Sequence, residues 1–384
     1  MEIKVRVPKG FVLEKAVCNH GFFMMAPNRW MPSTKTLVRP LRLPDHRSVR
    51  VSISQPCTTF LSISAPDEPS LYSNSRVIKD QVKRMLRLSN ADEEQLKKFH
   101  GLHKDAAKKG FGRLFRNPSL FEDLVKSLLL CRASYVHVLP NSVLIILLKS
   151  YSSLQTFRPY EQKLKGLKKS FKESLELAEG LCVLQKRLNI EKGVVDPAKR
   201  GRKKQSFCVE ESWGNFPSPQ EVAIFKNPIL LNKKCNLGYR AQYVHELAKN
   251  ITDGKIRLMD LEKLCDGNEL YQKLMPLSGF GDFVSSNALM CMGFYDAIPC
   301  DSETVRLIKQ VHQREDCDKK NMNVMAMEIY DRYAPFQTLA YWSELVDYYE
   351  NKVGKLNELD RCLYKNVGGS AIEKTYITND THLD

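Results

Sequence analysis

The sequence lacks any C-x-x-C pair, and its 11 cysteines are scattered over 384 residues. An odd number of scattered thiols is typical of a protein with reduced cysteines rather than of a disulfide framework. The scatter also differs from the paired spacing of a zinc finger and from that of a four-cysteine iron–sulfur site. We therefore expect free thiols and no iron–sulfur cluster.

Long apolar runs are missing as well. The longest, Val143–Leu148, is far shorter than the roughly 20 residues that a helix needs to cross a bilayer. The first ten residues, MEIKVRVPKG, do not contain the apolar core of a signal peptide. These absences predict a soluble protein of a reducing compartment.

Positive charge is what the sequence has in excess. Lys and Arg total 59 against 44 Asp and Glu, a net charge of +15, which favours an acidic partner such as nucleic acid or an anionic membrane surface. The excess is uneven: residues 251–384 contain 15 basic and 22 acidic residues, a net −7, so residues 1–250 carry +22. Hydrophobic residues make up 43% of the chain, enough for a sizeable core, and the length suggests two or three domains.

The hydrophobic periodicity changes near residue 75. Before it, Val49, Val51 and Ile53 alternate with polar residues, the period of a half-buried strand, and frequent prolines mark turns. After it, segments such as 121–128 show the i, i+3, i+4, i+7 spacing of amphipathic helices. We predict an α+β fold, mainly α, with a β-rich domain over 1–75 and a helical domain over 76–130 and 173–365.

Three stretches interrupt this pattern. Residues 131–172 have no clear helical face and read as an atypical insertion. Residues 191–215 contain the basic run 199–204 and read as a surface linker, in which the run is either a nuclear localisation signal or a solvated loop. Residues 366–384 are polar and predict a disordered tail.

The region 261–310 carries the most informative motif. A helix over 268–275 ends at the turn Pro276–Gly281, and a second helix begins near Asp282. Gly279 and Gly281 are expected to supply positive φ angles and to let a ligand approach the backbone. The amides of 279–283 would then open at a helix N-terminus, which is a site for a phosphate group. An ordinary αα-hairpin is the alternative.

The hairpin and the segment after its second helix resemble those of a known family. LSGFG (277–281) and IPCDSETVRLI (298–308) are similar, in order and spacing, to the hairpin and the V-P-V-D segment of the helix-hairpin-helix DNA glycosylases. Four further segments resemble that superfamily, especially its 8-oxoguanine and alkyl-base branch: GRLFRNPSLFEDLVKSLLL (112–130), FPSPQEVA (216–223), LGYRAQYV (237–244) and YAPFQTLAYW (333–342). The resemblance implies a small antiparallel β domain ahead of a helical domain.

Asp301 matches the catalytic carboxylate of that family. Breaking an N-glycosidic bond passes through an oxocarbenium-like sugar, which a carboxylate can stabilise while it orients the attacking water. Asp is also a preferred N-cap, and Asp301 precedes a predicted helix, so a purely structural role is the alternative.

Phe283 departs from the family pattern. Bifunctional members have a nucleophilic lysine at this position, which forms a Schiff base with the sugar. Phenylalanine cannot do so, which implies a monofunctional enzyme that uses water. Glu303 is a second departure, because a histidine is often found there and a carboxylate would repel a phosphate.

The resemblance also implies ligands for DNA and for a cation. The DNA contacts would be made by Gly279, Phe280, Gly281, Asp282, Phe283 and Arg306. A monovalent cation would be bound by the backbone carbonyls of Met275, Leu277 and Phe280, and no other cofactor is required. The aromatic residues Phe336, Tyr341 and Trp342 lie near the segment that lines the base pocket in relatives, although core packing is the commoner role of such residues.

Two functions are compatible with these features. The first is a monomeric nuclear base-excision repair enzyme that hydrolyses the glycosidic bond of a damaged or mismatched base flipped out of duplex DNA. The second is a catalytically inactive DNA-binding protein that retains the fold. A membrane partner has only the net charge in its favour and is not expected.

Overall fold

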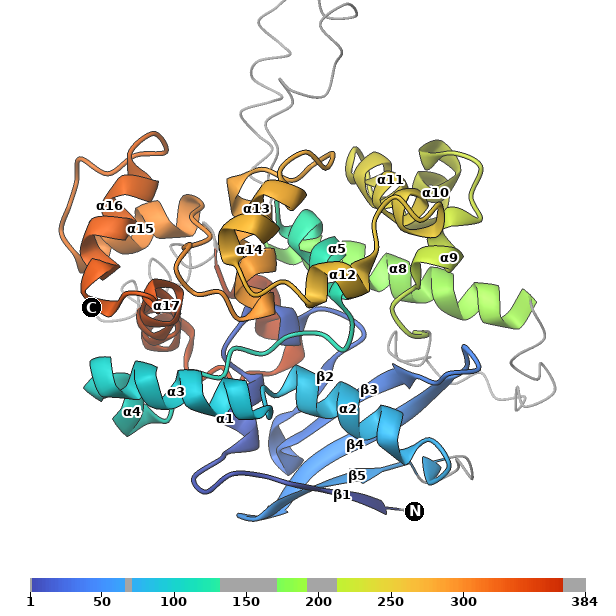
Figure 1. Cartoon of the computed structure of the whole chain (residues 1–384), viewed down its shortest axis with the longest axis horizontal. Coiled ribbons are helices and arrows are strands. Elements are labelled where there is room, and N and C mark those ends of the chain that lie inside the picture. Colours follow the sequence, from blue (N-terminus) through green and yellow to red (C-terminus); the bar gives the residue numbers. More distant parts are fainter. Residues whose placement is uncertain (1, 66–70, 132–170, 192–212, 369–384) are drawn as a thin grey trace, which may run out of the picture.

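A computed structural model describes residues 2–65, 71–131, 171–191 and 213–368 (Figure 1). A five-stranded antiparallel sheet at the N-terminus is followed by helices, which confirms the predicted α+β, mainly α class. Figure 1 shows the sheet on one side of the molecule, with α13 and α14 between α15–α17 on the left and α9–α11 on the right. One hydrophobic core runs through the sheet and the helices.

The sheet has the strand order β1-β5-β4-β3-β2. Its strands are β1 (Glu2–Arg6), β2 (Arg29–Met31), β3 (Thr36–Arg42), β4 (Ser48–Cys57) and β5 (Phe60–Ser64). The predicted alternation in β4 is confirmed, since Val49, Val51 and Ile53 are all buried. Their shared face packs into the core because side chains two residues apart lie on one face of a strand.

Helices account for most of the rest of the described chain. They are α1 (Leu13–Val17), α2 (Ser75–Met85), α3 (Asn90–Leu102), α4 (Lys104–Lys109), α5 (Leu120–Leu130), α8 (Phe171–Glu191), α9 (Pro219–Ala223), α10 (Pro228–Cys235), α11 (Arg240–Thr252), α12 (Leu258–Glu262), α13 (Gly267–Leu274), α14 (Asp282–Met292), α15 (Ser302–Val311), α16 (Met322–Tyr330) and α17 (Gln337–Val353). The 3-10 helices are η1 (Gly21–Met24), η2 (Pro32–Thr34), η7 (Asp331–Tyr333) and η8 (Arg361–Asn366). Several begin at Ser or Asn side chains that accept a backbone N–H of the first turn, as Ser119 does for α5 and Ser218 for α9.

Helix α5 connects the sheet to the helical part through buried charges. Arg39 on β3 is 1% exposed, and its Nη2 lies 2.9 Å from Glu122 Oε2 on α5. Lys126, one turn further along α5, lies 2.8 Å from the other oxygen of Glu122. Burial lowers the pKa of Lys126, the effect expected for an ammonium group held in a low-dielectric interior.

The interruptions predicted from the sequence lie largely outside the described residues, but their edges are visible. Residues 171 and 172 begin α8, and the Ser174 hydroxyl donates to the carbonyl of Leu129 at 3.0 Å, so α8 packs against α5. Trp213 and Asn215 are buried, although the predicted surface linker extends to residue 215. Val367 is also buried, inside the predicted tail. The described helices include none that is long and apolar enough to span a membrane, and the ten described cysteines are free.

Candidate active site

The hairpin between α13 and α14 has the predicted turn, with Gly279 at its centre. Gly279 has φ 85°, a conformation that L side chains rarely adopt. A Cβ at this position would lie 2.7 Å from the Tyr243 ring and 3.0 Å from the Leu128 side chain. The glycine is therefore required both by the backbone conformation and by the close packing of the turn on α5 and α11.

The predicted positive φ at Gly281 is wrong. Its φ is −100° and its ψ −173°, an extended conformation open to any residue, and it is the N-cap of α14. A Cβ there would meet nothing within 4 Å. The open space agrees with the other half of the prediction, that a ligand can approach this backbone.

The N-terminus of α14 has no side-chain cap. The first helical bond runs from the Ser285 amide to the Gly281 carbonyl at 3.0 Å, so the amides of residues 282–284 precede the helical ladder. The Asp282 side chain accepts a hydrogen bond from the Tyr271 hydroxyl at 2.7 Å. Burial and this carboxylate together raise the pKa of Tyr271 to about 12, so the phenol remains a donor at neutral pH.

The predicted cation ligands lie at the same turn. Met275 follows the last residue of α13, and the Leu277 carbonyl accepts the Phe280 amide at 3.0 Å. A carbonyl oxygen has two lone pairs, so Leu277 can accept this bond and still face a cation. The described residues contain no cluster of three His, Cys, Asp or Glu side chains that could hold a metal ion.

Asp301 is fixed at the start of α15. Its Oδ1 accepts the Glu303 amide at 2.8 Å. Its side chain also accepts the Thr304 amide, and its own amide donates to Thr304 Oγ1 at 3.1 Å, which is a reciprocal capping box with Thr304. Thr304 Oγ1 also lies 2.9 Å from the Tyr341 hydroxyl of α17. The carboxylate is half-buried at a helix N-terminus, where the helix dipole favours negative charge.

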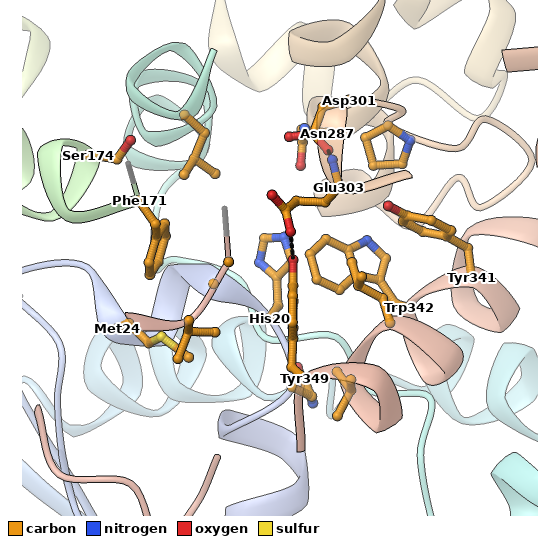
Figure 2. Close-up of a pocket in the computed structure, with 18 of the residues that line it drawn as sticks. His20, Met24, Phe171, Ser174, Asn287, Asp301, Glu303, Tyr341, Trp342 and Tyr349 are labelled. Atoms are coloured by element: carbon orange, nitrogen blue, oxygen red, sulfur yellow. Dashed lines mark hydrogen bonds between the residues drawn. The ribbon is translucent and has the colours of Figure 1, made fainter. Parts of the chain in front are cut away.

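Asp301 lines a cavity of about 110 Å³ where several segments that are distant in the sequence meet. A cavity needs roughly 10–15 Å³ to hold one water, so this space has room for several waters or for a group the size of one ring system. Figure 2 shows Asp301 and Asn287 at one end and Tyr349 at the other, with Phe171 and Met24 facing Tyr341 and Trp342 across it. The lining residues come from the η1 corner (Asn19, His20, Gly21, Met24), α5 and α8 (Leu130, Phe171, Ser174), α14 (Phe283, Asn287), the α15 start (Pro299, Asp301, Glu303), α17 (Tyr341, Trp342, Leu345, Val346, Tyr349) and the C-terminal segment (Leu356, Val367, Gly368).

Glu303 faces this cavity from the first turn of α15. Its side chain is 11% exposed, and its Oε2 lies 2.6 Å from Arg306 Nη1 and accepts the Tyr349 hydroxyl at 3.3 Å. Arg306 is thus ion-paired with Glu303, one turn away on the same helix. The predicted repulsion between Glu303 and a phosphate is reduced, because the carboxylate is withdrawn from the surface and paired with a cation.

His20 forms part of the cavity wall beside Trp342. The two ring centres are 4.5 Å apart in an edge-on arrangement, and His20 Nδ1 has no hydrogen-bond partner among the described residues. Burial, reinforced by the positive charges of Arg87 and Lys126, lowers the pKa of His20 to about 3. The imidazole is therefore neutral at physiological pH, and the described cavity lining contains no Lys or Arg.

The structure brings together some of the predicted residues and separates others. Asp301 and Phe283 line the cavity, and so do two of the three aromatic candidates, Tyr341 and Trp342. Phe336, the third, is a core residue packed beside Phe99. Gly279, Phe280, Gly281 and Asp282 lie in the hairpin, which meets the cavity through the first turns of α14.

Sequence reasoning missed His20, Phe171, Asn287 and Tyr349. His20 precedes a 3-10 turn in the β-rich segment, nearly 300 residues before Asp301, and no local motif connects the two. Asn287 and Tyr349 lie on helices that were predicted, one turn beyond Phe283 and two turns beyond Trp342. Their helical spacing from those residues was the one signal that could have indicated them.

Comparisons with known proteins place the fold. No family model and no curated protein match the sequence. Among solved structures, the 3-methyladenine DNA glycosylase of Archaeoglobus fulgidus matches with a TM-score of 0.54 at 16% identity, over 89% of this chain and 98% of that one. The apo 8-oxoguanine glycosylase/lyase of Clostridium acetobutylicum matches with a TM-score of 0.53 at 15% identity, over 89% and 94%. The chain therefore has the fold of the helix-hairpin-helix DNA glycosylases, the superfamily that its motifs resemble.

Proposed function

We propose that this chain is a monofunctional DNA glycosylase, which hydrolyses the N-glycosidic bond of a damaged or mismatched base flipped out of duplex DNA. The observation that carries the proposal is the position of Asp301 in the wall of a cavity the size of one ring system, within a DNA glycosylase fold. A flipped base would occupy the cavity, and its sugar would lie against Asp301.

The chemistry follows from that placement. As the bond between C1′ and the base nitrogen breaks, the electron pair leaves with the base and C1′ becomes cationic. The Asp301 carboxylate stabilises this charge and orients a water, whose oxygen adds to C1′. The water loses one proton to the carboxylate or to solvent, and the departing base takes up one proton from solvent, so the two balance. The products are the free base and an abasic site in an uncut strand.

Backbone groups would make more of the contacts with DNA than charged side chains would. The uncapped amides of residues 282–284 at the α14 N-terminus can bind one phosphate, and the carbonyls of Met275, Leu277 and Phe280 can hold a monovalent cation beside it. Arg306 would reach DNA only by sharing its guanidinium with Glu303. A solved glycosylase/lyase with this fold, from Clostridium acetobutylicum, is bound to double-stranded DNA containing cytosine opposite 8-oxoguanine.

Water as the nucleophile is supported by Phe283, which lines the cavity where bifunctional relatives have lysine. No lysine is among the described lining residues, so an amine for a Schiff base would have to come from elsewhere. We also propose that the protein is a monomer. A nuclear location is proposed from the basic run 199–204, which lies outside the described residues.

The test is excision from duplexes containing 8-oxoguanine, alkylated purines, uracil or mismatches. We expect abasic sites that break only on alkaline treatment, and no adduct trapped by borohydride. Asp301→Asn should lower excision at least about 100-fold because the charge that stabilises the sugar cation is lost. The fold should persist, since Asn is also a good N-cap. The exposed Asp253 at the end of α11 gives the control Asp253→Asn, which should retain activity. Equal excision by wild type and Asp301→Asn would contradict the assignment.

Phe283 also favours a second function, a DNA-binding protein without catalysis, because this chain does not have the lysine that bifunctional relatives use. In that case the full chain would bind duplex DNA and leave every base of the panel intact. Asp301→Asn would then leave DNA binding unchanged, and neither the variant nor the wild type would release a base. The same experiment therefore distinguishes the two functions.

A further inference from the structure

Asn287 is a buried amide in the cavity wall, and the fold leaves its oxygen without a partner. The residue lies on α14 and is 1% exposed, and its Nδ2 donates to the Phe283 carbonyl, one turn back, at 2.9 Å. A carbonyl only accepts, so the amide presents its nitrogen to the helix and its oxygen elsewhere. No described residue donates to Asn287 Oδ1. A buried acceptor without a partner costs stability, so it requires an explanation.

The cavity reaches this oxygen. Polar atoms that are enclosed without a partner occur in the same wall, at His20 Nδ1 and Trp342 Nε1, and Asn287 Oδ1 is not one of them. An oxygen of a buried residue that has no partner and is not enclosed must border open space. Because Asn287 lines the cavity, that space is the cavity.

Other polar side chains of the described wall are held by the protein. Asn19 uses both ends of its amide on backbone groups, since its Oδ1 accepts an amide at 2.9 Å and its Nδ2 donates to two carbonyls. The Ser174 hydroxyl donates to a carbonyl of α5 at 3.0 Å, and the Tyr341 hydroxyl lies 2.9 Å from Thr304 Oγ1. Asn287 differs from them because its acceptor faces whatever enters the cavity.

Asn287 and Asp301 lie at the same end of the cavity, as Figure 2 shows. Phe283 also lines the cavity and shares a face of α14 with Asn287, because residues four apart lie on one side of a helix. Its ring offers no hydrogen-bonding atom where bifunctional relatives have an amine. The amide oxygen one turn further along is therefore the polar group that α14 contributes to this end of the cavity.

A water that attacks C1′ is oriented best when both of its hydrogens are bound. If both are donated to fixed acceptors, the lone pairs face the remaining side, and one of them can point at C1′. A single acceptor leaves the water free to rotate about its one hydrogen bond. The carboxylate of Asp301 and the amide oxygen of Asn287 are two different acceptors on two different elements, which fixes the direction of attack.

We propose that Asn287 is a second catalytic residue, which accepts one hydrogen of the attacking water while Asp301 accepts the other. This inference rests on the proposed function, because it takes the cavity to hold the flipped base and its sugar. One lone pair of the water forms the bond to C1′, and the hydrogen that faces Asp301 leaves as a proton to that carboxylate or to solvent. The hydrogen bound to Asn287 stays in the new hydroxyl. The electron pair of the broken bond leaves with the base, which takes up one proton from solvent.

The test lets methanol compete with water during single-turnover excision by the full chain, on the duplex that the wild type excises fastest. Methanol has one O–H hydrogen, so it can use only one of the two acceptors. It gives a methyl glycoside, which mass spectrometry of the strand separates from the abasic product. Asn287→Leu keeps the branched shape of asparagine and removes the acceptor without opening space. We expect the ratio of methyl glycoside to abasic product to rise about 2- to 10-fold, the range for one net hydrogen bond, because only water loses a partner.

A second pair of variants isolates the oxygen from the polarity and the space around it. Thr and Val have nearly the same shape, but only threonine carries an oxygen, which in a helix can donate to the carbonyl four residues back and still accept from a water. We expect Asn287→Thr to give a lower ratio of methyl glycoside to abasic product than Asn287→Val.

Controls separate this role from packing. Asn323 is exposed on α16 and does not belong to the described cavity lining, so Asn323→Leu should leave the product ratio unchanged. Kd for a duplex whose lesion is on a 2′-fluoroarabino sugar, which resists hydrolysis, should be nearly the same for the wild type and Asn287→Leu. The product ratio is measured within one sample, so an unfolded fraction of the protein does not alter it.

The outcomes distinguish this inference from the proposed function. Excision with the same product ratio in the wild type and Asn287→Leu overturns the role of Asn287 and leaves the glycosylase assignment standing. Equal ratios in Asn287→Thr and Asn287→Val overturn it as well, and this pair decides if Asn287→Leu releases too little base for product analysis. Absence of excision by the wild type overturns the proposed function and the role of Asn287 with it.

Discussion

Gly279 and Gly281 lie two residues apart in one turn, but their backbone conformation and the space around them differ. Gly279 has a positive φ and no room for a side chain against Tyr243 and Leu128. Gly281 is extended with open space around its Cα. The motif alone assigns both glycines the same role, and only the packing of α5 and α11 beneath the turn separates them.

Gly279→Ala should therefore destabilise the protein, and Gly281→Ala should not. The first forces an L side chain into φ 85° and pushes its Cβ against the Tyr243 ring, which together cost about 1–3 kcal/mol of the free energy of unfolding. The second fits the existing backbone. Urea unfolding of both variants measures the difference, and equal midpoints for the two would show that the turn relaxes without strain.

Individual site residues were predictable where a short motif contains them. Asp301 and Phe283 follow from the spacing of the hairpin and the segment after it, and both line the cavity. His20 and Tyr349 were not predictable, because tertiary folding alone brings the η1 corner and α17 to Asp301. The sequence marks Glu303 only as a departure from the family pattern, and its contacts with Arg306 and Tyr349 are visible only in the fold.

At the scale of elements, the segments with a regular hydrophobic period were predictable, and the residues at which segments begin and end were less so. Strand alternation in β4 and the hairpin helices follow from local sequence, since burial of one face requires that pattern. Residues 213–215 read as linker because their neighbours are polar, yet Asn215 is buried and its amide donates to Gln185 Oε1 at 2.8 Å. Side-chain partners far along the chain decide such positions.

Helix α5 is buried on nearly every side, including the charged residues Glu122, Asp123 and Lys126. Its sequence reads as an amphipathic helix with a polar face, and that face is covered by β3 and the segment before α5. Arg39 compensates Glu122 from the sheet, and Arg116 compensates Asp123 at 3.0 Å. The charges that look exposed in the sequence thus connect two elements of the fold.

Arg39→Met should accordingly destabilise the protein strongly. It removes a guanidinium that is 0% exposed in its side chain and leaves Glu122 with Lys126 alone, a loss of about 3 kcal/mol in the free energy of unfolding. Arg47→Met is the control, because Arg47 pairs with Asp45 in solvent and should leave the urea midpoint nearly unchanged. A small effect at Arg39 would mean that the sheet and α5 contribute independently to stability.

At the scale of the whole molecule, the cavity depends on both ends of the described chain. The η1 corner supplies His20, α14 and α15 supply Phe283 and Asp301, and the segment after α17 supplies Val367. One hydrophobic core connects these parts, so the cavity forms only when the sheet and the helices have folded together. A group buried in its wall therefore reports on global unfolding.

His20 is such a group, and it predicts how stability depends on pH. Its pKa is about 3 in the folded protein and about 6.5 in the unfolded chain, so between these values only the unfolded state binds the proton. The free energy of unfolding then falls as pH decreases through this window, by about 1.4 kcal/mol per pH unit once well below 6.5. Between pH 7 and pH 5 the His20 contribution is about 2 kcal/mol, and it hardly depends on the folded pKa as long as that lies below about 4.

His20→Gln should remove this contribution. Altered packing beside Trp342 changes the variant's free energy of unfolding equally at both pH values. Between pH 7 and pH 5, the free energy of unfolding of the variant should therefore fall by about 2 kcal/mol less than that of the wild type. Urea unfolding of both proteins at the two pH values provides the comparison, and the difference of differences cancels the packing change and the other titrating groups. Parallel pH dependences for wild type and variant would show that His20 is protonated in the folded protein. The wall of the cavity would then carry a positive charge at pH 5 instead of a neutral imidazole.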